Sequence, residues 1–461
     1  MRSYLLIAPE LVMLASALLA MFADVLPVRG RRVAAWIGAS GALIAAVLAL
    51  AVGPGSVTMF GSMLRFDGMA VFARVATAGL TAVYLLWLAG NGASVGRARE
   101  ATALALLAAM GGMLMAGARD LVLLFLTMEA ATMPAYVLIG FDRGDERGLE
   151  GALKYFLLSM VTSLVMLYGM TFLFGMSGTT SLDGLRVTAF GSLGLIAAVF
   201  TIVGLLAKLS AAPFHYWSPD AYAGAPVFSV AFVSSVPKIA GMVALVRVVA
   251  VLGPQVRGLT DVLLAVAVVS LVIGNLAAFP QKDIRRLMAY SGVAHVGYML
   301  LALASGTEAG AIGAVLYALA YAVPSMAIMF IVAEEGSTLD DLDGLLSRRP
   351  FAAWAMLIFL LSLVGVPPLA GFFGKLYMFS AALDAALVWP VVLAFVFSAV
   401  SAGYYFGIVR AVFFGLKPRA VRVRSTRNRA ADVAIVACLL ATLLMGLVAG
   451  PLLSGLGYAL R

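Results

Sequence analysis

Residues 205–226 read LLAKLSAAPFHYWSPDAYAGAP and lie within an apolar stretch that extends far in both directions. Lys208 and His215 flank Pro213, and a proline removes an amide donor and clashes with the preceding helical turn. Interrupted backbone at membrane depth is tolerated only where protein or a water-filled cavity surrounds it. We therefore expect a broken helix that opens a hydrated cavity, with Lys208 at its edge.

The composition of the whole chain is that of a membrane protein. Of its 461 residues, 63% are hydrophobic and 11% are charged, and the mean hydropathy is +1.06. Soluble domains carry about 25% charged residues, so we expect an integral protein whose surroundings are a lipid bilayer. The basic residues behind the net charge of +9 are spread over short loops, which indicates membrane topology rather than nucleic-acid binding.

Metal and nucleotide chemistry are not expected in this chain. One cysteine, Cys438, and two histidines are too few for a zinc or iron–sulfur site. No glycine-rich phosphate loop follows a strand-like run of residues. We therefore expect no cofactor and no metal here, and any redox chemistry must take place in another subunit.

The lengths of the apolar stretches predict the fold class. A helix needs about 20 apolar residues to cross the hydrocarbon core, and this length predicts an all-α polytopic membrane protein with about fourteen transmembrane helices. The first stretch is too long, and carries Glu10 too early, to be a cleavable signal peptide. The expected spans are 4–24, 33–53, 67–89, 101–118, 120–141, 149–176, 188–222, 225–251, 259–279, 283–304, 309–333, 351–385, 387–415 and 431–456.

The charges of the loops predict an orientation. Eighteen lysines and arginines fall in the odd-numbered loops, and six fall in the even-numbered loops and the two ends. Loops rich in lysine and arginine stay in the cytoplasm. We therefore expect the odd-numbered loops to face the cytoplasm and both termini to lie on the outer side.

Two expected spans, 188–222 and 351–385, are each 35 residues long, which is too long for one straight crossing. Prolines interrupt both, and the second reads GVPPLAGFFGK at residues 365–375. Interrupted helices at corresponding places in two halves are typical of inverted-repeat transporters, although two ordinary proline kinks would give the same pattern. We expect one membrane domain, 1–461, divided into helices 1–3 in 1–100, a five-helix repeat in 101–251, an inverted five-helix repeat in 259–415, and a last helix, 431–456.

Ionisable residues lie inside several spans. Glu129, Lys238 and His295 are in the middle of their spans, and Lys208 and Lys375 lie beside the two interruptions. A charge at the bilayer centre costs about 2.5–3.5 kcal/mol, so such residues usually face a polar interior and pair with one another. The alternative is that each is a snorkelling side chain or a member of a structural ion pair.

Lysine and glutamate are suited to moving protons through such an interior. Burial destabilises the charged form of both types and brings their titration toward physiological pH, and an ion pair restores the charged forms. Making and breaking a pair would switch whether the lysine holds its proton, and water along the broken helices would carry the proton onward. The roles of His215 and Arg74 stay open, and Arg247 is expected to be a snorkelling anchor near a helix end.

Several segments of the sequence resemble a known family. They resemble subunit N among the antiporter-like membrane subunits of the proton-pumping NADH–quinone oxidoreductase, respiratory complex I, over most of residues 100–415. Other family members usually have H-A-A-T where this chain has SSVPK, and often an acidic residue in place of Ala223. The segments are LVLLFLTMEAATMPAYVLIGF, GALKYFLLSMVTS, AKLSAAPFHYWSPDAYAGAPVFSVAFVSSVPKIAG, RRLMAYSGVAHVGYML and GVPPLAGFFGKLYMF.

The resemblance implies a proton relay and a role for each matched residue. Glu129 would pair with Lys208, Lys238 would link two half-channels, His295 would bridge from Lys238 to Lys375, Lys375 would be the terminal lysine, and Lys154 would be an accessory site. It also implies partners, namely the other antiporter-like and small membrane subunits of a complex in the inner membrane of a bacterial or archaeal-type cell. Quinone, flavin and iron–sulfur clusters would belong to those partner subunits.

Other functions remain open from the residues alone. The electron donor of such a complex could be NADH, a deazaflavin or ferredoxin, because this subunit would touch none of them. A subunit of a multi-subunit cation/proton antiporter would call for more membrane carboxylates than Glu129, the one that lies firmly at mid-span. A silent assembly scaffold would not need all of these charged positions.

The loop charges give a testable topology. A reporter fused after residue 424 should be cytoplasmic, and one fused after residue 461 should be periplasmic, because the positively charged loops stay inside. Paired alkaline phosphatase and green fluorescent protein fusions measure this directly. The reverse result would reassign the sides of the membrane and leave the residue roles unchanged.

Overall fold

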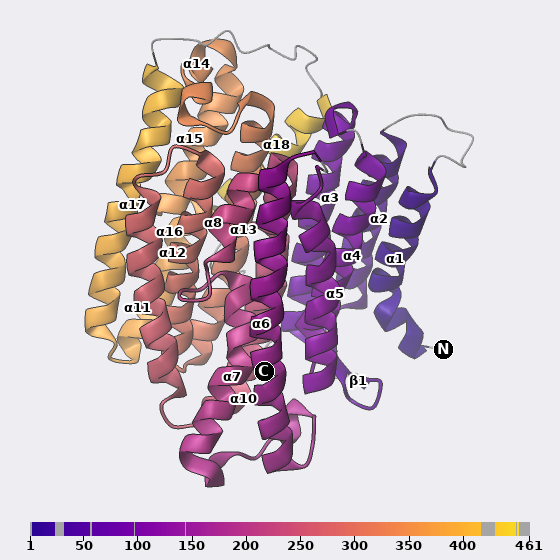
Figure 1. The fold of residues 1–461 in the computed structure, drawn as a ribbon, viewed down its shortest axis with the longest axis vertical. Helices are drawn as coiled ribbons and strands as arrows, with labels where there is room; N and C mark the ends of the chain where they lie inside the picture. Colours follow the sequence, from indigo (N-terminus) through magenta and orange to yellow (C-terminus); the bar gives the residue numbers. More distant parts are fainter. Residues whose placement is uncertain are drawn as a thin grey trace.

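The protein is a bundle of helices that run along one common direction (Figure 1). The computed structural model describes residues 2–23, 32–55, 58–95, 97–142, 144–415, 429–448 and 450. The reporter positions 424 and 461 and the end of the last expected span lie outside these residues. The first elements are a 3-10 helix η1 (Arg2–Ile7), α1 (Ala8–Met21), α2 (Val33–Val52), the hairpin strands β1 (Thr58–Met59) and β2 (Leu64–Arg65), and α3 (Gly68–Val95).

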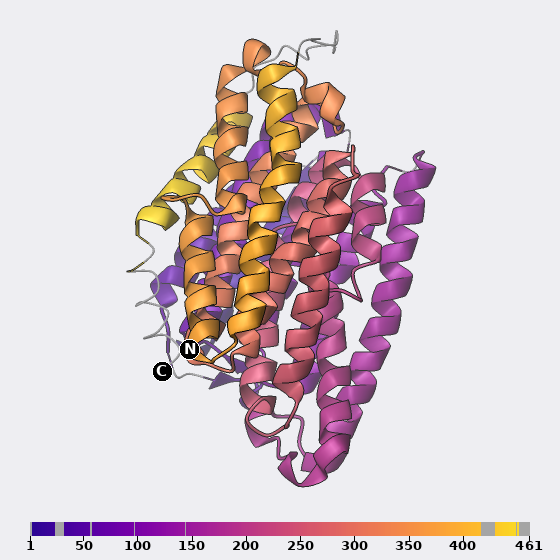
Figure 2. The same cartoon turned by 90° about the vertical axis from the view of Figure 1, so that its left-hand side faces the viewer.

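The rest of the described chain is helical apart from short connections, and Figure 2 shows the same bundle from the side. The first following group is α4 (Ala98–Gly117), α5 (Leu121–Ile139), α6 (Glu146–Ser177), η3 (Leu182–Gly184), η4 (Thr188–Phe190), α7 (Gly191–Leu209), α8 (Trp217–Gly224), α9 (Val227–Val233) and α10 (Val236–Leu252). The second group is α11 (Leu259–Ala278), α12 (Ile284–Ala304), α13 (Glu308–Glu335), η5 (Leu339–Leu342), α14 (Leu345–Arg348), α15 (Pro350–Val364), α16 (Ala370–Asp384), α17 (Val388–Phe414) and α18 (Arg429–Leu447).

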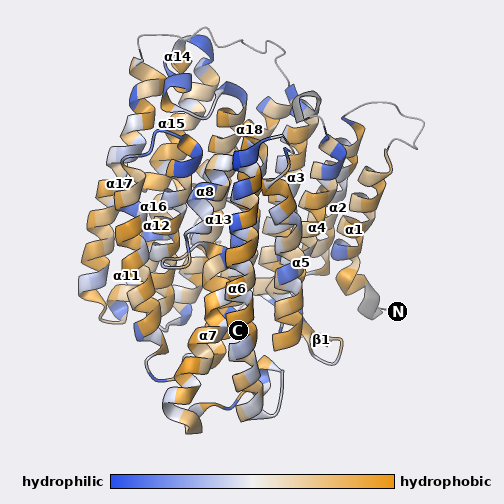
Figure 3. Ribbon diagram, viewed as in Figure 1, coloured by the Kyte–Doolittle hydropathy of each residue, from blue (hydrophilic) through white to orange (hydrophobic). Residues whose placement is uncertain are grey.

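The expected fold class, an all-α polytopic membrane protein, is confirmed. Among the described residues, twelve helices are long and apolar enough to cross a membrane, and two shorter apolar helices are Leu5–Met21 and Pro350–Val364. Hydrophobic residues dominate the helices, and hydrophilic ones gather at the end of the bundle around α14 (Figure 3). The number of crossings and the relation of the two five-helix sets as inverted repeats stay predictions.

The two long expected spans are interrupted in the structure. Residues 188–222 contain α7 and α8, separated by residues 210–216, and residues 351–385 contain α15 and α16, separated by residues 365–369. A third interruption was not expected from the sequence: α9 and α10 divide the span 225–251 at Ser234 and Ser235. This interruption places Lys238 in the first turn of a helix rather than in its middle.

Helices α12 and α13 form the centre of the bundle. Of their most apolar windows, 94% and 89% are buried, and α13 packs against α3, α9, α10, α12, α15, α16 and α18. Side chains on these two helices are therefore surrounded by protein on every side. By contrast only 33% of the corresponding window of α17 is buried.

Two buried arginines form ion pairs with acidic residues near the start of the chain. Arg74 of α3, which the sequence left open, is fully buried and binds both carboxylate oxygens of Glu10 at 2.6 Å. Arg247 was expected to be a snorkelling anchor, and this was wrong: it is 6% exposed and binds both oxygens of Asp67 and the carbonyl of Ala116. Burial raises the pKa of Asp67, but Arg247 outweighs it, so the pKa lies below its ordinary value.

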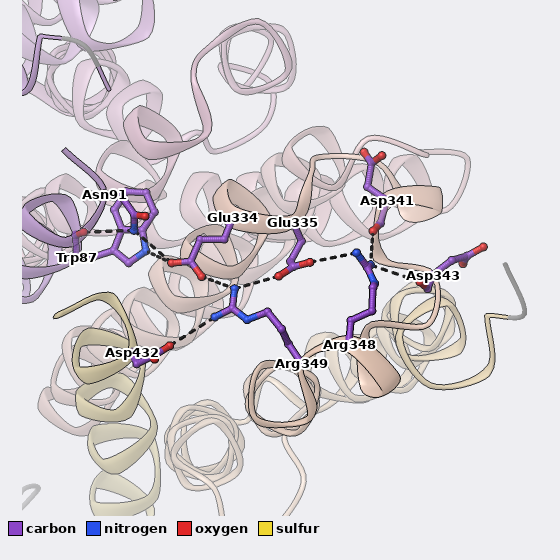
Figure 4. A network of polar contacts seen from close by, with 9 residues as sticks. All are labelled: Trp87, Asn91, Glu334, Glu335, Asp341, Asp343, Arg348, Arg349 and Asp432. Carbon is purple, nitrogen blue, oxygen red and sulfur yellow. Dashed lines mark hydrogen bonds and ion pairs between the residues drawn. The ribbon is translucent and has the colours of Figure 1, made fainter. Parts of the chain in front are cut away.

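A charge network closes the end of the bundle around α14 (Figure 4). Arg349 binds Glu334 and Glu335 of α13 at 2.6 and 2.9 Å and Asp432 of α18 at 3.4 Å. Trp87 of α3 donates to Glu334 at 3.0 Å. Burial lowers the pKa of Arg349, but the two glutamates outweigh it and raise the pKa above its ordinary value. The guanidinium of Arg349 thus connects the start of α15 to α13 and α18. Through its bond to Trp87, Glu334 also connects α13 to α3.

Close helix packing gives a stability prediction. A Cβ atom at Gly274 of α11 would lie 2.4 Å from the backbone nitrogen of Ala294 of α12, so Gly274→Ala should force the two helices apart. Overpacking of this kind costs about 1–3 kcal/mol, and we expect a lower apparent Tm for the purified complex. The matched control is Gly407→Ala on α17, where nothing lies within 4 Å. Alanine has a higher helix propensity than glycine, so Gly407→Ala should not lower the Tm. An unchanged Tm for Gly274→Ala would contradict the close packing of α11 on α12.

Candidate functional site

Lys208 and Glu129 form a loose ion pair that hydroxyl groups hold on both sides. Lys208 lies in the last turn of α7, and its Nζ is 3.6 Å from Oε1 of Glu129 on α5. The same ammonium donates to the hydroxyls of Tyr136 at 2.8 Å and Thr132 at 3.3 Å. Ser163 of α6 donates to Glu129 Oε1 at 2.6 Å. Each member therefore has partners that keep it solvated when the pair opens.

The chain next to Lys208 leaves the helix, and side chains satisfy its backbone. Ser210 adopts a left-handed conformation, with φ of 65°, and ends α7. The amide of Ala212 donates to Ser270 of α11 at 2.9 Å, and the indole of Trp217 donates to the carbonyl of Ala207 at 2.9 Å. These bonds replace those that the interrupted helix loses, as buried backbone requires.

Lys238 is buried, and its nearest polar partner among the described residues is a tyrosine hydroxyl. It is 3% exposed, and its Nζ lies 3.5 Å from the hydroxyl of Tyr321 on α13 and 4.9 Å from the centre of that ring. A Cβ atom at Gly292 of α12 would lie 2.7 Å from this Nζ, so the glycine makes the room that the ammonium occupies. Within the described part of the chain, no carboxylate lies at ion-pair distance from Lys238.

His295 lies between two tyrosine hydroxyls. Its Nδ1 is 2.8 Å from the hydroxyl of Tyr317 on α13, and its Nε2 is 3.1 Å from that of Tyr405 on α17. All three side chains are 1% exposed. The imidazole is therefore held on both nitrogens in a buried site, with one hydroxyl at each end.

Lys375 of α16 binds the interrupted backbone of α15. Its Nζ donates to the carbonyls of Leu363 at 3.0 Å and Val364 at 2.8 Å, and to the hydroxyl of Ser398 on α17 at 2.8 Å. The carbonyl end of a helix carries partial negative charge and favours a cation. Three oxygen acceptors thus solvate this ammonium in place of a carboxylate.

Lys154 of α6 has ion-pair partners of its own, although α6 packs against α5 and α7, which bear Glu129 and Lys208. Its side chain is 42% exposed, and its Nζ binds Glu150 and Asp220, each at 2.7 Å. Asp220 also pairs with Arg286 at 3.2 Å. His215 is 3% exposed and lines a cavity of about 310 Å³ with Asp220 and Arg286.

The structure brings the other predicted residues onto helices that contact one another. Helix α7 packs on α10, α10 packs on α13, and α12 packs on α13 and α16. The hydroxyl partners were not predicted from the sequence, because their only signal there is that they are polar residues within apolar helices. They are Thr132, Tyr136, Ser163, Tyr317, Tyr321, Ser398 and Tyr405. Within the described ranges, no group of three or more histidine, cysteine and acidic residues is placed to hold a metal ion.

Comparison with known proteins identifies relatives along the whole chain. A family model described as NADH:quinone oxidoreductase/Mrp antiporter, TM, matches residues 118–401. The NADH-quinone oxidoreductase subunit N of Sphingopyxis alaskensis is 38% identical over 80% of each chain. That of Erythrobacter litoralis is 35% identical and covers 99% of this chain and 95% of its own.

Solved structures agree with these relatives. A chain of respiratory complex I from Thermus thermophilus with bound aureothin has a TM-score of 0.82 and 33% identity, and covers 97% of this chain and 98% of its own. A chain of the Mrp complex from a Dietzia species has the same TM-score but 20% identity, over 99% and 96%, so it shares the fold alone. With a family model over more than half of its length and subunit N relatives of this identity, the chain belongs to the NADH:quinone oxidoreductase/Mrp antiporter family of membrane subunits, and within it to subunit N.

Proposed function

We propose that the chain translocates protons as the N-type membrane subunit of a quinone oxidoreductase of the complex I type. Electron transfer would take place in partner subunits that carry the quinone site, flavin and iron–sulfur clusters. The proposal is supported by relatives named subunit N of NADH-quinone oxidoreductase and by the likeness to a chain of respiratory complex I.

The observation that carries the proposal is the burial of lysines with unequal partners. Lys208, Lys238 and Lys375 are 9%, 3% and 5% exposed, and of these only Lys208 has a carboxylate at ion-pair distance among the described residues. Buried charges are normally paired, and an ionisable residue inside a membrane usually marks an ion or proton pathway. A lysine that no carboxylate fixes in its charged form can take up and release a proton.

In the proposed relay the Glu129–Lys208 pair is the switch. The ion pair is long, at 3.6 Å, and Lys208 also donates hydrogen bonds to Tyr136 and Thr132, so little movement would separate it from Glu129. A proton released by Lys208 would pass to Lys238, then through His295 to Lys375. Water along the broken helices would fill the distances between these groups.

The remaining parts of the proposal concern the surroundings. Lys154, with Glu150 and Asp220, would be an accessory site at the cytoplasmic end. Other antiporter-like and small membrane subunits would adjoin the chain in the inner membrane, with both termini on the outer side. Cation/proton antiport is the alternative; it would need more mid-membrane carboxylates than Glu129, and the buried Glu10 is already bound to Arg74.

The central lysine provides a direct test. Lys238→Ala should assemble normally and lower both proton pumping and coupled quinone reduction by at least about a hundredfold, the loss typical of a missing proton-transfer group. Lys238→Arg should retain little, because arginine keeps the charge and cannot release its proton. Pumping is measured in inverted membrane vesicles and normalised to assembled complex.

The matched control for this test is Lys282→Ala, which removes an exposed lysine from the connection between α11 and α12. It should keep wild-type pumping. Full pumping by Lys238→Ala at wild-type assembly would show that the central lysine is structural and would remove the basis of the proposal.

The Glu129–Lys208 pair provides a second test, by a double-mutant cycle. Glu129→Gln takes away the counter-charge of Lys208, and an uncompensated buried charge is unfavourable, so the lysine should hold its proton less firmly and transfer to Lys238 should stall. If the two residues act as one unit, Glu129→Gln with Lys208→Ala should cost little more than the worse single change. The measurement is proton pumping per assembled complex.

Strictly additive losses in the double variant would mean that the two residues work separately. The switch would then have to be abandoned, while the roles of Lys238 and Lys375 would stand. Ser163→Ala is an informative companion: it removes the 2.6 Å hydrogen bond to Glu129 but keeps both charges, so its loss should be smaller than that of either single variant.

A further inference from the structure

Four buried side chains from three helices form one continuous hydrogen-bonded chain. Ser291 of α12 bonds to the hydroxyl of Tyr405 of α17, which bonds to His295 Nε2, and His295 Nδ1 bonds to the hydroxyl of Tyr317 of α13. Ser291 is fully buried and the other members are 1% exposed. All bonds are between groups that can both donate and accept.

The hydrogen bonds of these four side chains can point in either of two directions along the row. A neutral imidazole has one N–H donor and one acceptor nitrogen. With the proton on Nδ1, His295 donates to Tyr317, Tyr405 donates to Nε2, and Ser291 donates to Tyr405. With the proton on Nε2, every bond is reversed. A hydroxyl has one hydrogen, so the three bonds must reverse together.

The imidazole in the middle of the hydrogen-bonded chain lies between two lysines that have no carboxylate at ion-pair distance among the described residues. On one side, the ring of Tyr321 lies 4.9 Å from that of His295 and 4.9 Å from Lys238 Nζ. On the other side, the ring of Tyr298 lies 5.8 Å from that of His295 and 4.8 Å from Lys375 Nζ. The hydrogen-bonded chain therefore lies between Lys238 and Lys375.

We propose that the hydroxyls of Tyr405 and Tyr317, with Ser291, carry the proton through His295 from Lys238 to Lys375, and that the chain passes one proton and must be reset before the next. This rests on the proposed proton translocation. A proton reaching Ser291 displaces its own, which moves to Tyr405; the Tyr405 proton moves to Nε2, the Nδ1 proton moves to Tyr317, and the Tyr317 proton leaves toward Lys375. Each O–H or N–H bond that breaks is replaced, and one proton crosses.

The transfer leaves the chain in its reversed direction. Resetting it requires the hydroxyls to rotate and the imidazole to exchange its proton from Nε2 to Nδ1 by way of a group outside the hydrogen-bonded chain. Until then the reversed chain can return the proton that it has passed, but it cannot pass a second one forward. Successive protons are therefore separated in time.

The tyrosine hydroxyls can be removed without changing the rings. Tyr405→Phe and Tyr317→Phe should each lower proton pumping about a hundredfold, as expected for a lost proton-transfer group, in inverted vesicles at wild-type assembly. The residual pumping should show a larger slowing in D₂O than wild type, because proton transfer then limits the rate. The matched control is Tyr84→Phe on α3, a fully buried tyrosine whose hydroxyl has no hydrogen-bond partner among the described residues and which should behave as wild type in both readings.

Wild-type pumping by either phenylalanine variant would contradict the proposed proton path, because the proton must pass both hydroxyls. A loss of pumping with an unchanged D₂O effect would also overturn it, since it would indicate disturbed packing. Lys238→Ala, measured alongside, separates this result from the proposed function. If Lys238→Ala stops pumping while Tyr405→Phe pumps normally, proton translocation by this subunit is supported and the path through the tyrosines is rejected. If Lys238→Ala pumps normally, the proposed function fails first.

Discussion

The structure depends on one constraint: in hydrocarbon, a charge or a backbone amide without a partner is too costly to leave exposed. Each interruption of a helix is accordingly placed inside the bundle and given its own acceptors and donors, such as Ser270 for the amide of Ala212. The same requirement brings Lys375 to the free carbonyls of Leu363 and Val364. Broken backbone and buried lysine thus stabilise each other.

The three buried lysines meet this constraint in different ways. Lys208 has a carboxylate and hydroxyls, Lys375 has three uncharged oxygens, and Lys238 has one tyrosine. The partners become fewer at the centre and more numerous at both sides. In the proposed relay, this difference would let Lys238 pass a proton between two lysines that have more polar partners among the described residues.

The sequence predicted the fold class and the two proline-marked interruptions because apolar length and proline chemistry are local properties. The interruption before Lys238 was not predicted, although Pro237 in the first turn of α10 is its local signal. Nor were the partners of His295 predicted, because Tyr405 lies 110 positions away along the chain. Side chains that are far apart in the sequence and meet only after folding show no characteristic spacing. The ion pair of Arg247 with Asp67 could not be predicted for the same reason.

Helix α17 has two faces with different surroundings. Its inner face contributes Ser398 to Lys375 and Tyr405 to His295, while its outer face leaves Trp389, Phe395 and Phe406 between 59% and 69% exposed. A neighbouring subunit that displaces those aromatic rings would move the helix that bears the two hydroxyls. A displacement of less than an ångström would break a 3.1 Å hydrogen bond, so this helix can convert mechanical motion outside the subunit into a change of proton connectivity within it.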